Sequence, residues 1–562
     1  MKEYALLGDE AVAMGAVHAG VSASYGYPGT PSTEILEWLI AKYEAGGPRA
    51  EWCANEKTAL EAALGVSFAG KRTLVTMKHV GLNVAADPFM NSALLEIKGG
   101  LVIAVADDPG MHSSQNEQDT RIFADFAMVP VLEPRSQQQA YEMTQAAFDL
   151  SEEFGVPVIM RLSTRLSHAR AGVRVVEQRS ENPLDKSQER TAWMLLPALA
   201  RKRYVKLIDK YAALIERSVK SAAAGKAAGS NSSELNRLEI DGRDTKSVVI
   251  TAGLGGNYYE ENEADLLAAV GAGKLPARLH IGMYPLPLES IQQLCADAQR
   301  VLVIEEGMPY IEQKLRGLLP QKLQIAGKLD GSLPRTGELD PDNVRQALQL
   351  SPLQTIADQT MPLPGRPPQL CKGCPHADSF DVIKKALEGK SSTAVTSDIG
   401  CYALGALPPY SVPETIVCMG ASVNMAKGAA DAGIEYSVAV LGDSTFLHSG
   451  MTATIDAVKA NTPMTLVILD NEAVAMTGCQ ETMIPSIRFR PLLEGLGVDP
   501  DHLIELEAKR VKEEENLEAF RREIEYRGLS VIVFRRACLE AAKALKKKAG
   551  MVETLKAEGG QS

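Results

Sequence analysis

The 562-residue chain has few cysteines, few aromatic residues and no long uninterrupted apolar run. Its eight scattered cysteines are too sparse for the disulfide framework of a small secreted protein, and they favour a reducing, cytoplasmic setting. No apolar run approaches the roughly 20 residues that a membrane-spanning helix needs. The first residues, Met1 to Tyr4, lead into no apolar signal-peptide core. We therefore expect a cytoplasmic protein without a membrane segment.

Positive charge is also in short supply. Lys and Arg total 59 against 71 Asp and Glu, which gives a net charge of −12. This acidic balance argues against nucleic acid as the main partner. The length predicts three or four domains rather than a single core. A hydrophobic content of 45% with 23% charged residues is typical of a globular protein.

Paired cysteines are nearly absent. Cys371 and Cys374 form the only Cys-x-x-Cys pair, whereas a structural zinc site of this kind needs a second pair. We interpret these two residues as core or active-site-lining thiols.

The stretch from Val438 to Gln480 has the pattern of one βαβ unit. An apolar strand ends in Gly442-Asp443-Ser444, and a small-residue helix follows at about 450–460. A second strand, at 464–469, runs into Asp470-Asn471-Glu472-Ala473. In an open parallel sheet, both polar turns lie at the carboxyl ends of strands, where such folds bind ligands.

Oxygen atoms in these two turns suit a diphosphate carried by Mg²⁺. This ion prefers hard oxygen ligands and usually takes only a few of them from protein. Asp443, the side-chain oxygen of Asn471 and the backbone carbonyl of Ala473 could supply three. The backbone amides of Gly442 to Ser444 could face the phosphates. A Gly-Asp-Ser turn is common by itself, and the second turn at this spacing is what makes the pattern informative.

Polar residues also follow several predicted strands of the N-terminal part. Thr30 lies in a Pro-rich loop, where it could contact a ligand or simply belong to a Pro-Gly turn. Glu56 begins an Ala/Gly-rich helix, where it could serve a site or merely interact with the helix dipole. His79 and His112 lie in polar loops directly after apolar strands.

The alternation of strands and helices predicts an α/β fold made of several doubly wound parallel-sheet domains. A Pro-rich linker at 361–368 precedes the last of them. The predicted segments are an α/β domain at 1–172, a helical and flexible connection at 173–245, a second α/β domain at 246–350, a third at 351–540 and a basic tail at 541–562. The connection contains a predicted basic amphipathic helix around Lys202 to Lys220 and a small-polar run at 222–233.

Nine longer motifs carry a family resemblance: YPGTPSTEI, NEKTALEAALG, TMKHVGLNVAADP, DDPGMHSSQNEQDTR, CKGCPH, SDIGCYALGALPP, MGASVNMAKG, LGDSTFLHSG and LDNEAVAMTGCQ. Together they resemble the large (alpha) subunit of indolepyruvate ferredoxin oxidoreductase, a thiamine diphosphate-dependent 2-oxoacid oxidoreductase. The resemblance covers roughly 1–175 and 246–540. It implies that the first α/β domain binds the cofactor's pyrimidine, that the second is transketolase-C-terminal-like, and that the third binds the diphosphate.

The resemblance also implies roles for single residues. Glu56 would hydrogen-bond N1′ of the aminopyrimidine ring, and the cofactor itself would supply the base and the electron sink. Asp443, Asn471 and the Ala473 carbonyl would hold Mg²⁺. The other residues implied to bind the cofactor are Gly400, Cys401, Met419, Gly442 and Ser444.

Substrate contacts follow from the same resemblance. Thr30 and Arg121 would lie by the 2-oxoacid, with Arg121 as a carboxylate clamp. Met476 would face the substrate side chain, and a soft apolar residue there suits a bulky aromatic group. Three histidines are candidates for proton handling or polar contacts, with a structural role as the alternative for each: His79, His112 and His376.

The sequence departs from the family near its end. Family members usually continue into a ferredoxin-like domain with two four-iron clusters, which requires runs such as Cys-x₂-Cys-x₂-Cys-x₃-Cys-Pro. Here Cys538 is the only cysteine after Cys479. We therefore predict that this chain holds no iron–sulfur cluster.

Two activities remain open. In the first, an arylpyruvate is oxidatively decarboxylated to an aryl-acetyl-CoA, and the electrons leave through another subunit or carrier that bears a flavin or clusters. The family's small beta subunit is the expected partner, in an α₂β₂ assembly. In the second, the enzyme is a non-oxidative 2-oxoacid decarboxylase or a carboligase. An inactive scaffold is disfavoured because Glu56, Asp443 and Asn471 are all present.

Overall fold

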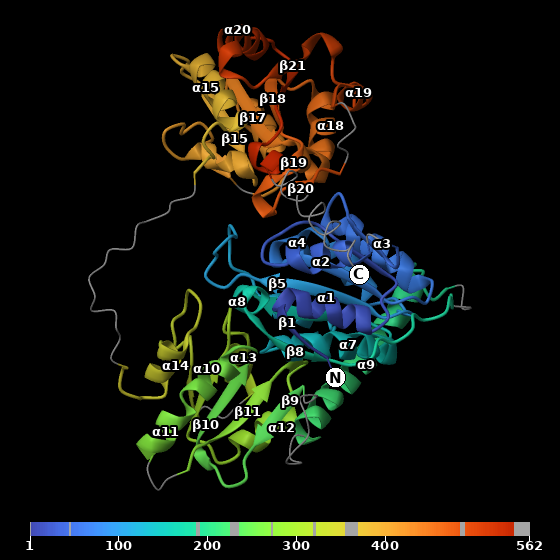
Figure 1. Ribbon diagram of the computed structural model, residues 1–562, viewed down its shortest axis with the longest axis vertical. Helices are drawn as coiled ribbons and strands as arrows, with labels where there is room; N and C mark the ends of the chain where they lie inside the picture. The colour runs from blue at the N-terminus through green and yellow to red at the C-terminus, as the bar shows by residue number, and fades with distance from the viewer. Residues whose placement is uncertain are drawn as a thin grey trace, which may run out of the picture. The chain divides into compact units, whose positions relative to one another are not determined.

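The computed structural model describes residues 2–43, 46–186, 191–224, 235–270, 274–318, 322–353, 369–416, 418–483 and 489–543. The chain forms two compact units, residues 1–360 and 361–562, which contain three large sheets (Figure 1). Most of the small-polar run at 222–233 and of the basic tail at 541–562 lies outside the described residues, and the predicted domain limits stay predictions. In the part of the chain that the structure describes, no helix has both the length and the apolar character needed to cross a membrane.

The first sheet has seven strands in the order β12-β6-β7-β5-β4-β2-β3. All neighbours pair in parallel except β12, which runs antiparallel to β6. The strands are β2 (Ala23–Gly26), β3 (Arg49–Trp52), β4 (Thr73–Lys78), β5 (Leu101–Asp107), β6 (Val131–Leu132), β7 (Val158–Ser163) and β12 (Met283–Tyr284).

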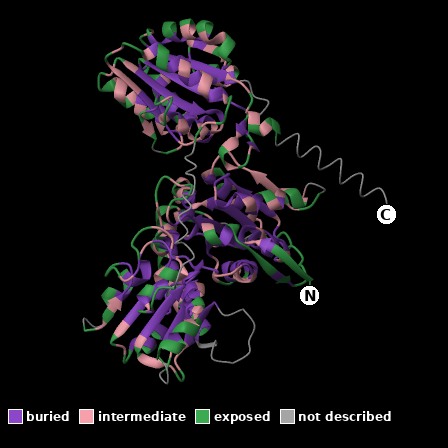
Figure 2. Cartoon of the chain, turned by 60° about the vertical axis from the view of Figure 1, so that its left-hand side comes forward, coloured by how far each residue is buried: buried purple, intermediate pink, exposed green. Residues whose placement is uncertain are grey.

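Helices cover both faces of this sheet, which is why its inner strands β2, β4, β5 and β7 are buried almost throughout, whereas the edge strand β3 is partly exposed. All seven residues of β5 are buried, and Figure 2 shows the strands as buried. One face packs on α1 (Gly8–His18), α2 (Thr33–Tyr43) and α7 (Gln137–Phe154). The other packs on α3 (Glu56–Phe68) and α5 (Ala86–Ser92). A short antiparallel pair, β1 (Lys2–Leu7) with β8 (Arg170–Val175), and the helices α4 (His79–Val84), α6 (Thr120–Ala127) and α8 (Thr164–His168) complete this part.

The second sheet, in the order β14-β13-β10-β11-β9, is parallel except for β9. Its strands are β9 (Asn236–Glu239), β10 (Asp244–Ala252), β11 (Pro276–Ile281), β13 (Arg300–Ile304) and β14 (Gln324–Ala326). Its helices are α10 (Gly255–Glu261), α11 (Glu263–Val270), α12 (Leu288–Cys295), α13 (Tyr310–Leu318) and α14 (Pro341–Ala347).

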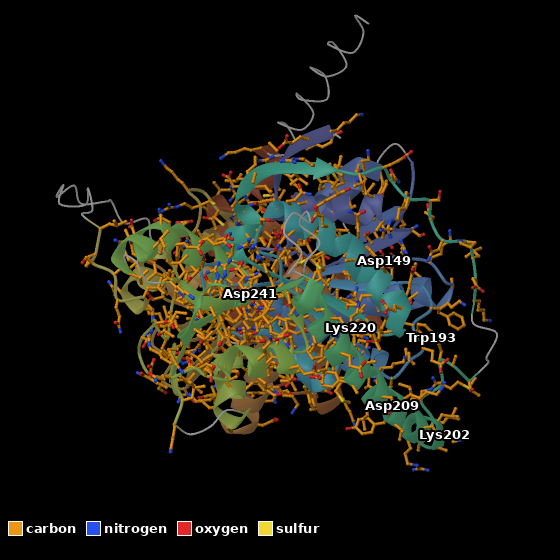
Figure 3. All side chains as sticks on the ribbon, turned by 90° about the horizontal axis from the view of Figure 1, so that it is seen from below. Asp149, Trp193, Lys202, Asp209, Lys220 and Asp241 are labelled. Atoms are coloured by element: carbon orange, nitrogen blue, oxygen red, sulfur yellow. The ribbon has the colours of Figure 1, made fainter. Side chains whose placement is uncertain are left out.

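The connection between the first two sheets contains one long helix, α9 (Pro197–Ala224). The sequence predicts a basic amphipathic helix around Lys202 to Lys220, and the structure extends it by about one turn at each end. Lys202, Asp209 and Lys220 mark its course in Figure 3.

The third sheet has six parallel strands in the order β16-β15-β17-β18-β22-β21. The strands are β15 (Thr393–Ser397), β16 (Thr415–Ile416), β17 (Tyr436–Gly442), β18 (Met464–Asp470), β21 (Leu503–Glu507) and β22 (Leu529–Arg535). The accompanying helices are α15 (Pro375–Leu387), α16 (Ala421–Asp431), α18 (Met451–Ala460), α19 (Phe489–Gly495) and α20 (Glu513–Ile524). The predicted α/β class with several parallel sheets is thereby confirmed.

A buried ionic network joins the first sheet to the second. The Arg121 Nε donates to Asp119 Oδ1 at 2.8 Å, and its Nη1 lies 2.9 Å from Glu305 Oε2. Its Nη2 also donates to the backbone carbonyls at 306 (2.9 Å) and 308 (3.0 Å). Neither Arg121 nor Asp119 exposes any side-chain surface. Arg161 Nε similarly reaches Asp107 Oδ2 at 2.7 Å. The guanidinium donors of Arg121 are therefore used within the fold.

Substitution of Arg121 tests this structural position. Because Arg121→Met removes the ion-pair partner of the buried Glu305 carboxylate and leaves Asp119 with Arg161 alone, we expect it to destabilise the folded protein by about 3–5 kcal/mol. Denaturant titration followed by tryptophan fluorescence measures the change. Arg49→Met, which removes an exposed ion pair with Glu51, is the control and should unfold like the wild type. Wild-type stability in Arg121→Met would contradict the structural assignment.

Candidate functional site

The carboxyl edge of the first sheet gathers one group of the predicted site residues. Thr30 follows β2, Glu56 follows β3, and His79 follows β4. Because neighbouring parallel strands all end at this edge, their following loops meet there although they are separated along the chain. The structure thus places Thr30, Glu56 and His79 at one edge of the sheet. Their chemical roles remain predictions.

Glu56 is buried, with 6% of its surface exposed. It is the first residue of α3, which is capped by Asn55 Oδ1 accepting from the Thr58 amide at 2.9 Å. A Cβ placed on Gly81 would lie 2.5 Å from Glu56 Oε1. Glycine at 81, in α4, is therefore what leaves space for the carboxylate.

The loop carrying Thr30 is tied to the loop after β5. The Ser113 hydroxyl donates to the Thr30 carbonyl at 3.1 Å, and the Ser113 amide donates to Asp108 Oδ2 at 2.8 Å. Thr30 itself is half-buried. These contacts fix the position of the loop through the Thr30 carbonyl and do not involve the Thr30 side chain.

Two of the N-terminal histidines have different environments. His79 is 2% exposed; its Nε2 lies 3.1 Å from the Asn116 carbonyl, and its buried Nδ1 has no hydrogen-bond partner among the described residues. An imidazole whose Nε2 donates leaves Nδ1 as a bare acceptor. His112 is largely exposed and its Nε2 lies 3.2 Å from Glu338 Oε2. His79 therefore belongs to the gathered edge, whereas His112 contacts another loop.

Arg121 is placed differently from the substrate clamp that the resemblance implies. It begins α6 close to this edge, but its donors are taken up by the buried network described above. To bind the substrate carboxylate, Arg121 would have to give up its contacts with Asp119, Glu305 and the carbonyl at 306. The proposed substrate site therefore does not include it.

The carboxyl edge of the third sheet gathers the second group. Asp443 directly follows β17, and Asn471 and Ala473 follow the adjacent strand β18. Asp443 Oδ1 accepts from the Ser444 amide at 2.6 Å, and Oδ2 accepts from the Glu472 amide at 2.8 Å. Glu472 has φ = 58°, the left-handed region that lets its amide turn toward Asp443. The two polar turns of the predicted βαβ unit are therefore joined directly.

A cation and a phosphate fit this pair of turns. Asp443 is only 3% exposed, and in the described part of the chain no basic side chain forms an ion pair with it. Burial, and next the Asp470 carboxylate, raise the pKa of Asp443 to about 7. The Ser444 hydroxyl is buried without a hydrogen-bond partner among the described residues. The Asp443 carboxylate is therefore suited to bind a divalent cation. The Ser444 hydroxyl, one residue later, is suited to donate to an anionic group.

The helix after Asp443 is locally widened. Asp443–Thr445 starts as an α-helical turn, α17, and Phe446–Gly450 continues as a π-helical turn, η3, before α18 begins. Such π turns occur often at functional sites. The sequence predicts an ordinary helix at about 450–460, and no local pattern in it indicates this turn.

His376 holds the second turn. Its Nε2 lies 3.2 Å from Asn471 Nδ2, and Asn471 Oδ1 accepts from the Ala473 amide at 3.2 Å. Burial lowers the pKa of His376 to about 4, so the ring is neutral near pH 7 and Nε2 can accept the amide hydrogen. His376 therefore orients the Asn471 amide, and it lies on α15, 95 positions earlier in the sequence.

Asp398 organises a third loop, which the sequence analysis did not assign. It follows β15, and its Oδ2 accepts from the Ser422 hydroxyl at 2.6 Å. The Tyr402 hydroxyl contacts Asp398 and lies 3.0 Å from Thr445 Oγ1. Burial raises the pKa of Asp398 to about 6. This network ties the loop that carries Gly400 and Cys401 to the turn that carries Asp443.

The remaining residues that are predicted to bind the cofactor lie near the same turns. A Cβ on Gly442 would lie 2.8 Å from the Tyr402 ring. Gly420, next to the half-buried Met419, has φ = 84°, and a Cβ there would lie 2.6 Å from Ser449 Cβ. Glycine is thus required where these loops approach one another. Met476, by contrast, is 55% exposed in this structure.

Five cysteines gather beside these turns. Cys401 lies close enough to Cys371, Cys374, Cys479 and Cys538 for all four thiols to raise its pKa, after burial. Their segments precede α15, follow β15, precede β20 (Gln480–Glu481) and follow β22, so only the fold brings them together. The Cys371 and Cys374 pair is therefore part of a larger set of thiols. Among the described residues no three Cys, His, Asp or Glu side chains form a ready-made metal site.

Comparison with known proteins assigns the family. The family model described as pyruvate flavodoxin/ferredoxin oxidoreductase, thiamine diphosphate-binding, matches residues 14–210. That of the thiamine pyrophosphate enzyme C-terminal TPP-binding domain matches residues 398–534. The two matches contain Glu56 and Asp443, respectively.

Several curated proteins are similar over nearly the whole chain. Indolepyruvate oxidoreductase subunit IorA of Archaeoglobus fulgidus is 35% identical, with 98% of this chain and 89% of that protein aligned. The protein of the same name from Methanothermobacter thermautotrophicus is 35% identical, over 96% of this chain and 88% of that protein. The one from Thermococcus kodakarensis is also 35% identical, over 95% and 85%. The chain therefore belongs to the indolepyruvate oxidoreductase subunit IorA family of thiamine diphosphate-dependent 2-oxoacid oxidoreductases.

Proposed function

We propose that this protein oxidatively decarboxylates an arylpyruvate, such as indolepyruvate, to the aryl-acetyl-CoA. The observation that carries the proposal is the joined pair of turns after β17 and β18, where no basic side chain among the described residues pairs with the buried Asp443. The aromatic substrate is proposed from the name of the relatives, indolepyruvate oxidoreductase. CoA is proposed as the acyl acceptor from the family resemblance.

In the proposed site, Mg²⁺ is held by the Asp443 carboxylate, the Asn471 side-chain oxygen and the Ala473 carbonyl. The Ser444 hydroxyl and the amides around Gly442 face the diphosphate, and Gly400, Cys401 and Met419 line the pocket beside it. When bound, thiamine diphosphate supplies the nucleophilic carbon and the electron sink for decarboxylation. His376 fixes Asn471, which keeps one metal ligand oriented.

Glu56 is proposed to hold a proton at N1′ of the cofactor's aminopyrimidine ring. Its burial against Gly81 places a carboxyl group in a site with little water, where a single hydrogen bond has a large effect. Thr30 and His79 lie along the same strand edge and are proposed to contact the 2-oxoacid. The bare Nδ1 of His79 is suited to accept a hydrogen bond.

Electrons from the oxidation must leave the chain. We propose a small beta subunit as partner, in an α₂β₂ assembly, with a flavin- or cluster-bearing carrier as acceptor; the relatives are themselves named as subunits. The sequence-based prediction that this chain holds no iron–sulfur cluster rests on the missing ferredoxin-type cysteine run after Cys479. The five gathered thiols are the place in the described chain where such a cluster could attach, since soft thiolates are the usual ligands of iron–sulfur clusters.

Iron analysis decides between these alternatives. Protein purified without oxygen is assayed for iron and acid-labile sulfide, beside a Cys401→Ser variant. We expect no stoichiometric iron if electrons pass directly to another subunit. About four irons and four sulfides per chain, lost in Cys401→Ser, would instead place an electron carrier among these thiols.

Product analysis tests the activity itself. The chain with its co-purifying partner is incubated with indolepyruvate or phenylpyruvate, Mg²⁺ and thiamine diphosphate, with and without CoA and an artificial electron acceptor. We expect CoA-dependent reduction of the acceptor and formation of the aryl-acetyl-CoA. Release of the aldehyde without reduction of the acceptor would make the protein a non-oxidative decarboxylase.

Replacing Glu56 tests the proton position. We expect Glu56→Gln to bind thiamine diphosphate like the wild type but to lose turnover by about 10²-fold or more, because the amide cannot hold the proton in the same way. Cofactor affinity by calorimetry and product formation by chromatography are measured on the same samples. Unchanged turnover would remove Glu56 from the mechanism.

The pH dependence of cofactor binding tests Asp443. Its pKa is about 7 in the fold against an ordinary value of 3.8, so between these values the folded chain binds a proton that the unfolded chain has released. Without metal, the contribution of this group to stability therefore falls as the pH rises through that range. Mg²⁺ requires the ionised carboxylate, and we expect the rise in Tm caused by Mg²⁺ and thiamine diphosphate to be larger at pH 8 than at pH 5.5. Asp443→Asn should abolish the rise at both values; an equal rise in wild type at both pH values would contradict the assignment.

A further inference from the structure

Lys78 occupies a central position at the carboxyl edge of the first sheet. It is the last residue of β4, between the loop that contains Thr30 and the start of α4. Its aliphatic stem lies against Gly29, where an added Cβ would be 3.1 Å from Lys78 Cγ and Cδ. Glycine at position 29 therefore lets the lysine stem run along the Thr30 loop.

The ammonium group of Lys78 is only weakly engaged. Its Nζ donates to the Ser113 carbonyl at 3.3 Å. Asp108 and Glu56 are near enough to favour its charge, yet burial outweighs them and lowers the pKa of Lys78. Among the described residues, no carboxylate oxygen comes within ion-pair distance of this Nζ. The ammonium of half-buried Lys78, with one long hydrogen bond, has donors left for an anionic ligand.

The contrast with Arg121 is chemical as well as geometric. Arg121 is fully enclosed, and carboxylates and carbonyls occupy its guanidinium. Lys78 lies within the gathered edge, with Glu56 as a neighbouring charge and the Thr30 carbonyl linked to it through Ser113. Of these two cations, Lys78 is the one that a substrate placed beside Thr30 and Glu56 would meet.

We propose that Lys78 binds the carboxylate of the 2-oxoacid substrate. This inference rests on the proposed function and names the cation of that same site.

A single ammonium suits a carboxylate that is about to leave. During decarboxylation the bond between the carboxyl carbon and the carbonyl carbon breaks, its electron pair stays on the substrate, and neutral CO₂ departs. Negative charge on the carboxylate therefore falls toward the transition state. A guanidinium making two parallel hydrogen bonds would stabilise the ground state more strongly, whereas a point charge positions the group at a smaller cost to the barrier.

The test compares substrate charge in matched variants of the holoenzyme with its partner. We expect Lys78→Gln to raise KM for phenylpyruvate by about 30- to 100-fold, the loss of a charge-assisted hydrogen bond in a buried site. Inhibition is measured with 3-phenylpropionate and with its neutral amide, 3-phenylpropanamide. The wild type should prefer the acid, and Lys78→Gln should lose that preference while its affinity for the amide and for thiamine diphosphate stays unchanged.

Two further variants keep the outcome interpretable. Lys78→Arg retains the positive charge and should retain most of the preference for the acid. Lys71 lies two residues before the start of β4, where it pairs with Glu181. Lys71→Gln should therefore behave like the wild type. If wild-type protein turns over phenylpyruvate but Lys78→Gln keeps its KM and its acid preference, the assignment is overturned. If wild type itself turns over no arylpyruvate under any condition, the proposed function fails instead.

Discussion

Parallel strand pairing determines where the polar residues that follow the strands lie in this protein. In the first sheet, β2, β3, β4 and β5 are neighbours in parallel or end at a shared edge, so the residues after them meet although about 80 positions separate Thr30 from Asp108. In the third sheet the same rule brings Asp398, Asp443 and Asn471 together. Both edges depend on inner strands that are buried almost throughout, because only strands covered on both faces leave their ends as the place for polar chemistry.

Buried charge has two distinct uses in the N-terminal unit. Around Arg121 and Arg161, cations and carboxylates neutralise one another and join the first sheet to the second. Such pairs are costly to break, because either partner alone would be buried without its counter-charge. At Lys78 the ammonium makes one long hydrogen bond among the described residues, which is the condition under which a bound anion gains most. The difference between a residue that builds the fold and one that serves a ligand lies in the partners, which residue type alone does not reveal.

The third sheet shows how strongly one turn depends on its neighbours. Asp443 is aligned by the amides of Ser444 and Glu472, and Asn471 is aligned by His376 from a distant helix. Tyr402 and Asp398 connect the preceding loop to the same turn. The five thiols close to this region likewise come from four separate segments. A magnesium and diphosphate site here would thus rest on several loops, each fixed by buried hydrogen bonds.

The sequence alone determined the α/β class, most strand positions and the family, because apolar runs, glycine turns and long motifs are local signals. It also located Asp443 and Asn471, since both lie within one βαβ unit. Only the tertiary structure decided which polar residues share a site. Arg121 lies in buried ion pairs, Lys78 lies near Glu56, and His376 contacts Asn471. The sequence could not reveal these contacts because they join segments far apart in the chain. The gathering of Cys401 with Cys479 and Cys538 was hidden for the same reason: spacing in sequence carries no information about distances across a sheet edge.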